Sequence, residues 1–353
     1  MMEDRKLLRG NEVIAEAAIR AGCQCYFAYP ITPQAELLEH MARNMPRLGR
    51  TFVQAESELA AINMVYGASS VGVRTMTSSS SPGISLKQEG ISYLAGSNLP
   101  AVIVNVVRGG PGLGDIAPAQ CDYFQATKGG GHGDYRMIVL GPSTVPEAGE
   151  LTMLAFDLAD RYLMPVMILA DGMLGQMMEP VTLPEPVDMA SLPPKEWATT
   201  GADGREPNVI LSFDLDPEVL KKMNLALQEK YRRVEAAEVR YEVAGEDDAP
   251  DVFIAAFGTV ARIAKSVMDM ARGEGIKLGL FRPITLWPFP YEPLRKIAEK
   301  VSTVLTVEMN AGQMHEDVRL AVGERADTPF YGELGGVVPT PRRILAEVKK
   351  YAC

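Results

Sequence analysis

AVIVNVV, residues 101–107, is followed directly by Arg108 and a glycine-rich stretch. A continuous apolar run of this length is typical of a parallel strand that is buried on both faces. Shorter runs of similar character occur at 25–29, 51–54, 73–77, 137–140 and 166–170. Because helical patterns separate these runs, the sequence predicts a doubly wound α/β fold with a mostly parallel sheet.

The helices between these strands are predicted from apolar spacing and from the residues at their ends. Asn11 has a side chain suited to an N-cap, and a helix is expected to follow it. An alanine-rich helix is predicted over 56–66, ended by Gly67. The segment 78–83 (SSSSPG) is expected to form a loop, with the next helix beginning at Ile84.

The length of 353 residues suggests two domains with a connection between them. Residues 180–210 contain six prolines, which is typical of an extended linker. Further strand and helix patterns follow that linker, after an acidic, turn-rich loop at 245–250. We therefore predict a first domain over 1–179, the linker over 180–210, and a smaller α/β domain over 211–353.

The charge and cysteine content exclude some classes of function. The chain has 35 Lys and Arg against 45 Asp and Glu, a net charge of −10, which argues against nucleic-acid or anionic-membrane partners. No secretory signal and no apolar run of about 18 residues is visible, so we expect a cytoplasmic protein without a membrane span. Four cysteines at Cys23, Cys25, Cys121 and Cys353 suit a reducing compartment, and their spacing is not that of a ferredoxin-like cluster.

Several polar groups are expected to converge at one edge of the sheet. Ligands of open α/β sheets bind beyond the carboxyl ends of the strands. The YPITP segment (29–33), the serine run at 78–81 and Arg108 each leave a predicted strand at that edge, and Glu58 lies near the start of a helix that follows one. We therefore place the candidate site there.

The motifs at this edge resemble a known family. YPITP, QAESELAAINMVYGAS, TSSSSPGISLKQEGISYLAG, VNVVRGGPGLG and YFQATKGGGHGDYR are similar to segments of the alpha-type subunit of 2-oxoacid:ferredoxin oxidoreductases. GLFRPITLWPFP and VEMN resemble that subunit's second, transketolase C-terminal-like domain. The resemblance implies that the first domain binds the pyrimidine of thiamine diphosphate. Within the family, the chain looks closest to the branched-chain (2-oxoisovalerate) members and their 2-oxoglutarate relatives.

By this resemblance, Glu58 is the catalytic glutamate that activates the cofactor. A carboxylate hydrogen-bonded to the pyrimidine N1′ favours the protonated ring, and with it the imino group that takes the thiazolium C2 proton. The alternative is that Glu58 only caps its helix, a role that Glu56 fits equally well.

The same resemblance assigns substrate and cofactor contacts. Thr32 and Arg108 correspond to the family's substrate-binding residues, since a guanidinium can grip a carboxylate through two parallel hydrogen bonds. The alternatives are a turn residue between prolines for Thr32 and a solvated strand-end charge for Arg108. The cofactor-binding residues, besides Glu58, are expected to be Pro30, Ile31, Ser81 and Gly83.

Other polar residues near these motifs carry weaker signals. Helix capping is the favoured role for most of the serines at 78–81. Lys87, Gln88 and Glu89 are expected on the following helix, where a surface role is as plausible as a role in the site. His132, in the second glycine-rich loop, is more often structural or exposed than catalytic at such a position.

The missing motifs imply partner chains. Asp171-Gly172 is only a fragment of the family's motif for diphosphate and Mg²⁺, so those groups are expected on a beta-type subunit. The resemblance also implies a ferredoxin-like subunit with 4Fe–4S clusters, a gamma-type subunit and external ferredoxin. The shared reaction converts a 2-oxoacid and coenzyme A to acyl-CoA and carbon dioxide while ferredoxin is reduced.

Three alternatives stay open at this point. The first is a 2-oxoglutarate enzyme, for which Lys128 or Arg136 could bind the distal carboxylate. The second is a lipoamide-linked dehydrogenase or transketolase-like component. The third is a scaffold subunit whose cofactor site has decayed.

Overall fold

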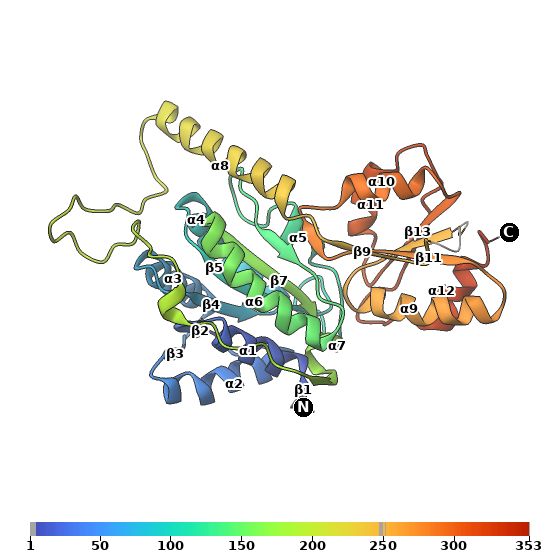
Figure 1. The fold of residues 1–353 in the computed structure, drawn as a ribbon, viewed down its shortest axis with the longest axis horizontal. Helices are drawn as coiled ribbons and strands as arrows, with labels where there is room; N and C mark the ends of the chain where they lie inside the picture. The colour runs from blue at the N-terminus through green and yellow to red at the C-terminus, as the bar shows by residue number, and fades with distance from the viewer. Residues whose placement is uncertain (1–4, 247–249, 251, 353) are drawn as a thin grey trace.

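A computed structural model describes residues 5–246, 250 and 252–352. Its larger unit contains a seven-stranded sheet in the order β12-β6-β7-β5-β4-β2-β3 (Figure 1). The strands are β2 (Cys25–Ala28), β3 (Thr51–Gln54), β4 (Thr75–Ser79), β5 (Ala101–Val107), β6 (Ile138–Leu140), β7 (Pro165–Asp171) and β12 (Thr285–Trp287). Only β12 runs antiparallel to its neighbour, so the mostly parallel α/β sheet is confirmed.

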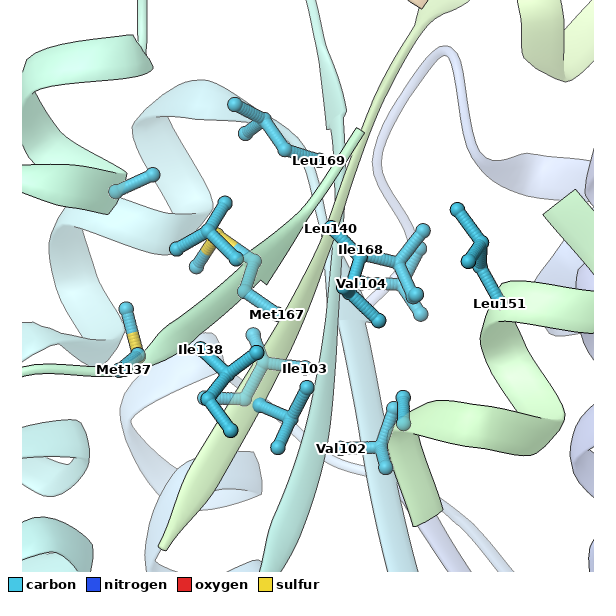
Figure 2. Close-up of a cluster of buried hydrophobic side chains, with 14 of the residues drawn as sticks. Val102, Ile103, Val104, Met137, Ile138, Leu140, Leu151, Met167, Ile168 and Leu169 are labelled. Carbon is cyan, nitrogen blue, oxygen red and sulfur yellow. The ribbon is translucent and has the colours of Figure 1, made fainter. Parts of the chain in front are cut away.

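The centre of this sheet forms a dry core. Figure 2 shows branched side chains of β5, β6 and β7 in contact, with Leu151 of a covering helix beside them. Val104 and Ile168 are completely buried. Burying each such side chain contributes roughly 1.5–3 kcal/mol, which makes this core the rigid base for the loops at the sheet edge.

Helices cover this sheet, and those that follow β3 and β4 start at its carboxyl edge. The helices are α1 (Gly10–Arg20), α2 (Ala35–Asn44), α3 (Glu58–Ser70), α4 (Ser81–Gly96), α5 (Tyr123–Thr127), α6 (Val145–Tyr162), α7 (Gly172–Gln176) and the 3₁₀ turn η1 (Pro46–Leu48). α1 packs against α2 and α6, and α3 packs against α4.

Three predicted helix ends are wrong. Asn11 lies inside α1, where its buried amide donates to the Pro33 carbonyl and to Glu36 (2.8 Å each), so it does not cap that helix. Gly67 lies inside α3, which continues to Ser70 and stops before Gly72, whose φ is +83°. α4 begins at Ser81, so Ser78 and Ser79 belong to β4 and the predicted loop is nearly absent.

The smaller unit contains a five-stranded sheet in the order β14-β13-β10-β11-β9. Its strands are β9 (Tyr241–Ala244), β10 (Val252–Ala255), β11 (Leu278–Pro283), β13 (Thr303–Glu308) and β14 (Phe330–Gly332), and its helices are α9 (Gly258–Gly273), α10 (Tyr291–Ala298), α11 (Gln313–Val322) and α12 (Pro341–Val348). Side chains of β10 alternate between two cores: Val252 and Ile254 face the unit's own core, whereas Phe253 and Ala255 join the larger one. The two units therefore share buried surface.

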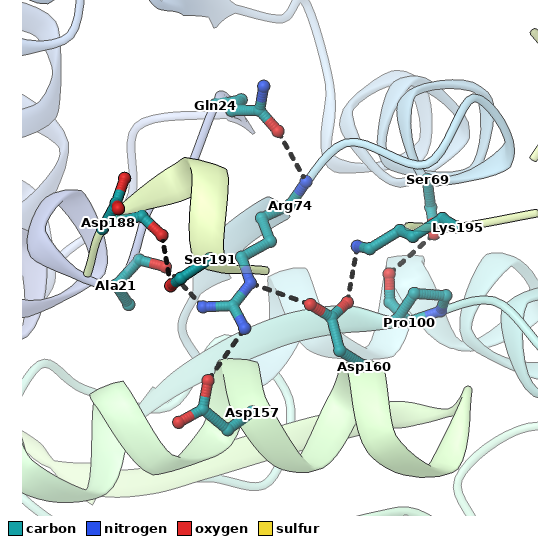
Figure 3. A network of polar contacts seen from close by, with 10 residues as sticks. All are labelled: Ala21, Gln24, Ser69, Arg74, Pro100, Asp157, Asp160, Asp188, Ser191 and Lys195. Atoms are coloured by element: carbon teal, nitrogen blue, oxygen red, sulfur yellow. Dashed lines mark hydrogen bonds and ion pairs between the residues drawn. The ribbon is translucent and has the colours of Figure 1, made fainter. Parts of the chain in front are cut away.

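The proline-rich segment is fixed to the larger unit. β8 (Met178–Val181) pairs antiparallel with β1 (Lys6–Arg9), and a 3₁₀ turn, η2, spans Met189–Ser191. Figure 3 shows Arg74 bound to Asp157 and Asp160 (2.8 Å each), while Lys195 of the segment reaches Asp160 at 2.6 Å.

The helix after this segment also lies along the larger unit. In α8 (Pro217–Ala237), Lys230 donates to Asn98 Oδ1 (2.5 Å) and to the Leu163 carbonyl (2.9 Å). The domain division at 179 and 211 stays a prediction. Residues 247–249 of the acidic loop, and Cys353, are outside the described residues. No helix among the described residues is long and apolar enough to cross a membrane.

Candidate functional site

The predicted residues meet at the carboxyl edge of the larger sheet. Arg108 follows β5 and contacts the loop after β2 through Thr32. Its backbone N–H donates to the hydroxyl of Ser81, in the first turn of α4 (3.1 Å). Gly83, two residues further in the same turn, lies against Glu58 at the start of α3. The structure thus brings together segments that are far apart in the sequence.

Glu58 is a buried carboxylate with no capping role. Ser57 caps α3, because its hydroxyl accepts a hydrogen bond from the Ala60 N–H (3.1 Å). Glu58 is 6% exposed, and its carboxylate has no hydrogen bond to any described residue, whereas Glu56 is exposed. Because both carboxylate oxygens keep some contact with solvent, a ligand that donates a hydrogen bond can reach them.

Gly83 forms the floor beside that carboxylate. A Cβ at this position would overlap the Ser79 hydroxyl and lie 2.6 Å from Oε1 of Glu58. The hydroxyls of Ser79 and Ser80 are themselves buried without partners. The pocket therefore combines a residue without a side chain, an acid and two unused hydroxyls, which fits the edge of a polar heterocycle.

The serine side chains do not cap α4, contrary to the expectation for most of them. Ser80 is at the N-cap position, but its hydroxyl makes no capping bond. Ser78 donates to Oε1 of Gln34 (2.5 Å), and Ser81 contacts the backbone of Arg108. The serines instead connect neighbouring strand ends, a role that local helix signals could not indicate.

Arg108 is buried rather than solvated. Its side chain is 7% exposed, and its guanidinium donates to the carbonyls of Thr32 (3.0 Å) and Leu113 (3.2 Å). Its Nε is buried without a partner. The Thr32 side chain is exposed beside it, and Pro30 and Ile31 are exposed and half-buried respectively. Thr32, Pro30 and Ile31 are therefore accessible to a ligand at the edge, and the Arg108 guanidinium lies just beneath them.

Sequence reasoning missed the residues that hold the YPITP loop. Asn11 and Gln176 donate to the Pro33 carbonyl, at 2.8 and 3.3 Å. Gln34, which is completely buried, connects the same loop to Ser78. Each lies in or beside a helix with an ordinary polar pattern, so only the three-dimensional contact reveals its role.

Lys87 and Gln88 are buried in α4, so of the two roles that the sequence left open for them the surface role is excluded. Gln88 Oε1 accepts from the Tyr135 hydroxyl (3.1 Å), while Glu89 is exposed. Lys87 is 0% exposed, and burial lowers the pKa of its ammonium group to about 8, an effect that the charge of Glu58 opposes. The sequence alone could not decide between the two roles for Lys87, which follows Gly83 by one helical turn.

A cavity of about 470 Å³ opens between the two units next to Ser81. The larger unit contributes Gly109, Gly110, Cys121 and Asp122, and the smaller unit contributes Met309, Asn310, Gln313 and Leu334. Burial raises the pKa of the Asp122 carboxyl group. The glycine-rich loop that begins at Gly109 therefore lines a cavity, and the residues of the smaller unit were missed because nothing local in the sequence pairs them with that loop.

The remaining candidates lie elsewhere. Lys128 and Arg136 line a separate cavity of about 570 Å³ beside α8, and the Lys128 ammonium pairs with Asp317 at 2.5 Å. His132 is exposed, its carbonyl accepts from Ser92 (2.7 Å), and its ring meets Tyr93 edge-on.

Asp171 has a structural role in this chain. Its carboxylate accepts from the Met173 and Leu174 N–H groups at 2.9 and 3.1 Å and so caps α7. Within the described residues, no cluster of three or more His, Cys, Asp or Glu side chains could hold a metal ion. The residues present fit the pyrimidine half of thiamine diphosphate, whose ring Glu58 would face from its position against Gly83.

Comparisons with known proteins agree with this geometry. Residues 16–242 match the family described as "Pyruvate flavodoxin/ferredoxin oxidoreductase, thiamine diP-bdg", and 250–344 match "Pyruvate:ferredoxin oxidoreductase core domain II". The Ketoisovalerate oxidoreductase subunit VorB of Methanothermobacter marburgensis is 52% identical over 98% of both chains. The 2-oxoglutarate synthase subunit KorA of Methanothermobacter thermautotrophicus is 36% identical over 99% of both chains.

Two solved structures resemble the fold. The 2-oxoglutarate:ferredoxin oxidoreductase from Magnetococcus marinus, with 2-oxoglutarate, coenzyme A and succinyl-CoA bound, has a TM-score of 0.88 and 28% identity. That match covers 99% of this chain and 65% of the other, so the chain spans about two thirds of that protein's length. A split gene transketolase, an inactive beta4 tetramer, has a TM-score of 0.61 at 16% identity over 98% of both chains, a likeness of fold alone.

The fold and the site define a thiamine diphosphate-binding subunit of an oxidoreductase. The chain belongs to the 2-oxoacid:ferredoxin oxidoreductase family, in which it is an alpha-type subunit.

Proposed function

We propose that the chain provides the pyrimidine-binding half of the thiamine diphosphate site in a 2-oxoisovalerate:ferredoxin oxidoreductase. The reaction joins the acyl group of the 2-oxoacid to the sulfur of coenzyme A and releases carbon dioxide and a proton. Two oxidised ferredoxins each take one electron. The proposal is supported most by the unpartnered carboxylate of Glu58 against Gly83, at the edge that also carries Arg108.

Each residue of the site has a distinct role in this proposal. Thiamine diphosphate, when bound, supplies the carbon nucleophile that attacks the keto group and the sink for electrons released with carbon dioxide. Glu58 holds the proton of the pyrimidine N1′ through a charge-assisted hydrogen bond. Arg108 offers its unused Nε to the substrate carboxylate, and the exposed Thr32 hydroxyl can donate to the keto oxygen.

The cavity next to Ser81 supports an uncharged substrate side chain. No lysine or arginine lines it among the described residues, and Asp122 there would repel a second carboxylate. Lys128 and Arg136, the candidate cations for 2-oxoglutarate, line the other cavity. A branched aliphatic side chain therefore suits this chain's contribution better than 2-oxoglutarate does.

The partner chains follow from what this chain does not provide. We assign the diphosphate and Mg²⁺ to a beta-type subunit and the 4Fe–4S clusters to a ferredoxin-like subunit. A gamma-type subunit is the further partner chain of the complex. Coenzyme A is the co-substrate. These assignments rest on the resemblance and on the fit of only the pyrimidine half here.

The assembled complex provides the test of substrate class. Ferredoxin reduction should be measured with 2-oxoisovalerate, 2-oxoglutarate and pyruvate in the presence of coenzyme A. We expect kcat/KM for 2-oxoisovalerate to exceed the others by about 10-fold or more. A preference for 2-oxoglutarate would contradict the substrate assignment, and a complex that lacks a brown iron–sulfur subunit would favour a lipoamide-linked or transketolase-like component.

The catalytic assignment is tested in the same complex with two matched variants. Glu58→Gln should lower ferredoxin reduction about 100-fold or more while assembly is retained, because the amide cannot stabilise the protonated ring. Glu56→Gln, two residues away and exposed, should retain wild-type activity. Full activity in the Glu58→Gln complex would rule out the proposed role of Glu58.

A further inference from the structure

Lys87 carries a buried charge that the mechanism above does not use. Its side chain is 0% exposed and is among the largest fully buried side chains of the chain. Its Nζ has no hydrogen-bond partner in the described part of the structure. An ammonium group in this position loses its hydration without compensation. It can stay charged there only if an opposite charge or a hydrogen-bond acceptor is nearby.

The geometry of α4 directs this ammonium toward Glu58. Gly83, Lys87 and Gly90 share one face of the helix, and that face packs on α3: Gly83 lies against Glu58, and Gly90 lies against Ile62. Helical side chains lean toward the N-terminus of their helix, which here points Lys87 back toward Gly83 and the sheet edge.

Glu58 is the charged group that acts on the Lys87 ammonium from the described elements around it. On the other sides of α4, Tyr135 donates to Gln88, and Asp122 accepts from Asn105 at 2.8 Å. Glu58 in turn forms no salt bridge within 4 Å among the described residues. Lys87 and Glu58 therefore lie on packed helices, α4 and α3, and neither side chain is held by another salt bridge among the described residues.

We propose that Lys87 is a positioning residue whose ammonium is the internal counter-charge that keeps Glu58 a carboxylate in the thiamine diphosphate site. The inference rests on the proposed function, because it assigns Lys87 a task only if Glu58 faces the pyrimidine. Without the ammonium, a lone buried carboxylate takes up a proton more readily. The neutral acid can no longer stabilise a protonated ring, so activity would require a higher pH.

The test is the pH profile of kcat/KM for ferredoxin reduction by the assembled complex. In Lys87→Met the acidic limb of the profile should move upward by about one pH unit or more, the size of shift that a neighbouring opposite charge produces. Lys87→Arg, which restores the charge, should return the limb toward its wild-type position. A loss of packing alone would lower the rate at every pH without moving the limb.

A second readout does not depend on turnover. Calorimetry of thiamine diphosphate binding to the complex, repeated in two buffers of different ionisation enthalpy, counts the protons exchanged. Near neutral pH, Lys87→Met should change that count relative to wild type, and Lys87→Arg should not. An identical proton count in wild type and Lys87→Met would overturn the inference.

Lys230 offers a matched control. It is also buried, and burial lowers the pKa of its ammonium group to about 8, but its partners are Asn98 and Leu163 rather than Glu58. Lys230→Met should destabilise the chain and leave the acidic limb in place. A shift in Lys230→Met as large as in Lys87→Met would show that a general loss of stability is the cause.

Assembly of the variant complexes provides the last test. If Lys87→Met fails to assemble, the double variant Glu58→Gln/Lys87→Met should assemble, because it removes both buried charges. Failure of the double variant as well would overturn the pairing. If the Glu58→Gln complex is inactive and the pH profile of Lys87→Met equals that of wild type, the inference about Lys87 alone is wrong. If the Glu58→Gln complex is active, the proposed function itself is wrong.

Discussion

At the residue scale, the space beside Glu58 depends on the absence of a side chain at Gly83. Gly83→Ala would place a methyl group into the Ser79 hydroxyl and 2.6 Å from the carboxylate. Neither neighbour can retreat far, because both are buried in packed elements. We expect a stability loss of about 1–3 kcal/mol and a weaker response to added thiamine diphosphate. Thermal unfolding and cofactor titration of the complex measure the two effects.

Gly67→Ala is the control for that variant. Gly67 lies in the interior of α3, and a Cβ there would meet nothing within 4 Å. Alanine should therefore stabilise the helix by about 0.5–1 kcal/mol. A Gly83→Ala variant with wild-type stability and cofactor response would contradict the packing argument.

Glu308, at the end of β13, predicts a pH dependence of stability. Burial raises the pKa of its carboxyl group to about 7, although Asn310 and two backbone N–H groups donate to it. Because the pKa of Glu308 is raised in the folded state, the protonated carboxyl group stabilises the fold. This contribution is complete below about pH 4.5 and is lost as pH rises to about 7. The folded chain should lose a corresponding part of its stability over that window.

Glu308→Gln removes the titration and should flatten this part of the curve. The midpoint of urea unfolding, measured at steps between pH 4.5 and 7, would fall less in the variant than in wild type. Glu316→Gln, on the exposed side of α11, should leave the slope unchanged. A parallel decline in wild type and Glu308→Gln would refute the assignment.

The residues of the site differ in how far the sequence could predict them. Arg108 follows a long apolar strand and Ser81 follows a shorter, more polar one, so the rule that ligands bind at carboxyl edges was enough to place them. Asn11 and Lys87 lie in helices whose polar pattern is ordinary, and their burial depends on what packs against them. No local signal distinguishes a buried lysine from a solvated one.

At the scale of elements, the proline-rich segment is held at several points, one of which is Asp160, the shared partner of Arg74 and of Lys195 in the segment. Arg74 is 4% exposed, binds Asp157 and Asp160, and donates to the Ala21 carbonyl at 2.6 Å (Figure 3). Arg74→Met leaves the Ala21 carbonyl without this donor, while Asp160 keeps Lys195 and Asp157 is half exposed, so we expect a loss of about 1–3 kcal/mol. Limited proteolysis between 184 and 200, together with thermal unfolding, would detect release of the segment.

Lys195→Met is the milder comparison. Lys195 is less deeply buried and contacts Asp160 alone, so its removal should cost about 1 kcal/mol or less. Equal effects of the two variants would show that Arg74 has no special role in holding the segment.

Strands were predicted correctly where every residue of the strand is buried, and they were missed where a strand pairs with a segment far away in the sequence. β5 has the predicted bounds, 101–107, because all of its residues are buried. β12 has only three residues, Thr285–Trp287, and its partner β6 lies some 145 residues earlier. Such a short strand exists only because the larger sheet offers it an edge.

At the scale of the whole molecule, the two units are joined beside the cavity through Asp317 of α11. This carboxylate is 2% exposed and accepts hydrogen bonds from Tyr123 (2.6 Å), Tyr291 and Lys128. Tyr123 and Lys128 flank α5, next to Asp122 and Gln125 of the cavity wall. The position of that wall therefore depends on a contact made by the other unit.

Asp317→Asn removes the charge while it keeps the shape of this junction. The amide offers one acceptor oxygen where the carboxylate accepts from three side chains, so a buried phenol or the Lys128 ammonium loses its partner. We expect a stability loss of about 1–3 kcal/mol and an increase of KM for the 2-oxoacid that exceeds the change in kcat, because the wall moves and the reacting groups do not. Asp269→Asn, on the exposed face of α9, should change neither quantity. An Asp317→Asn complex with lowered kcat and unchanged KM would place the effect in the chemistry and contradict a role confined to the wall.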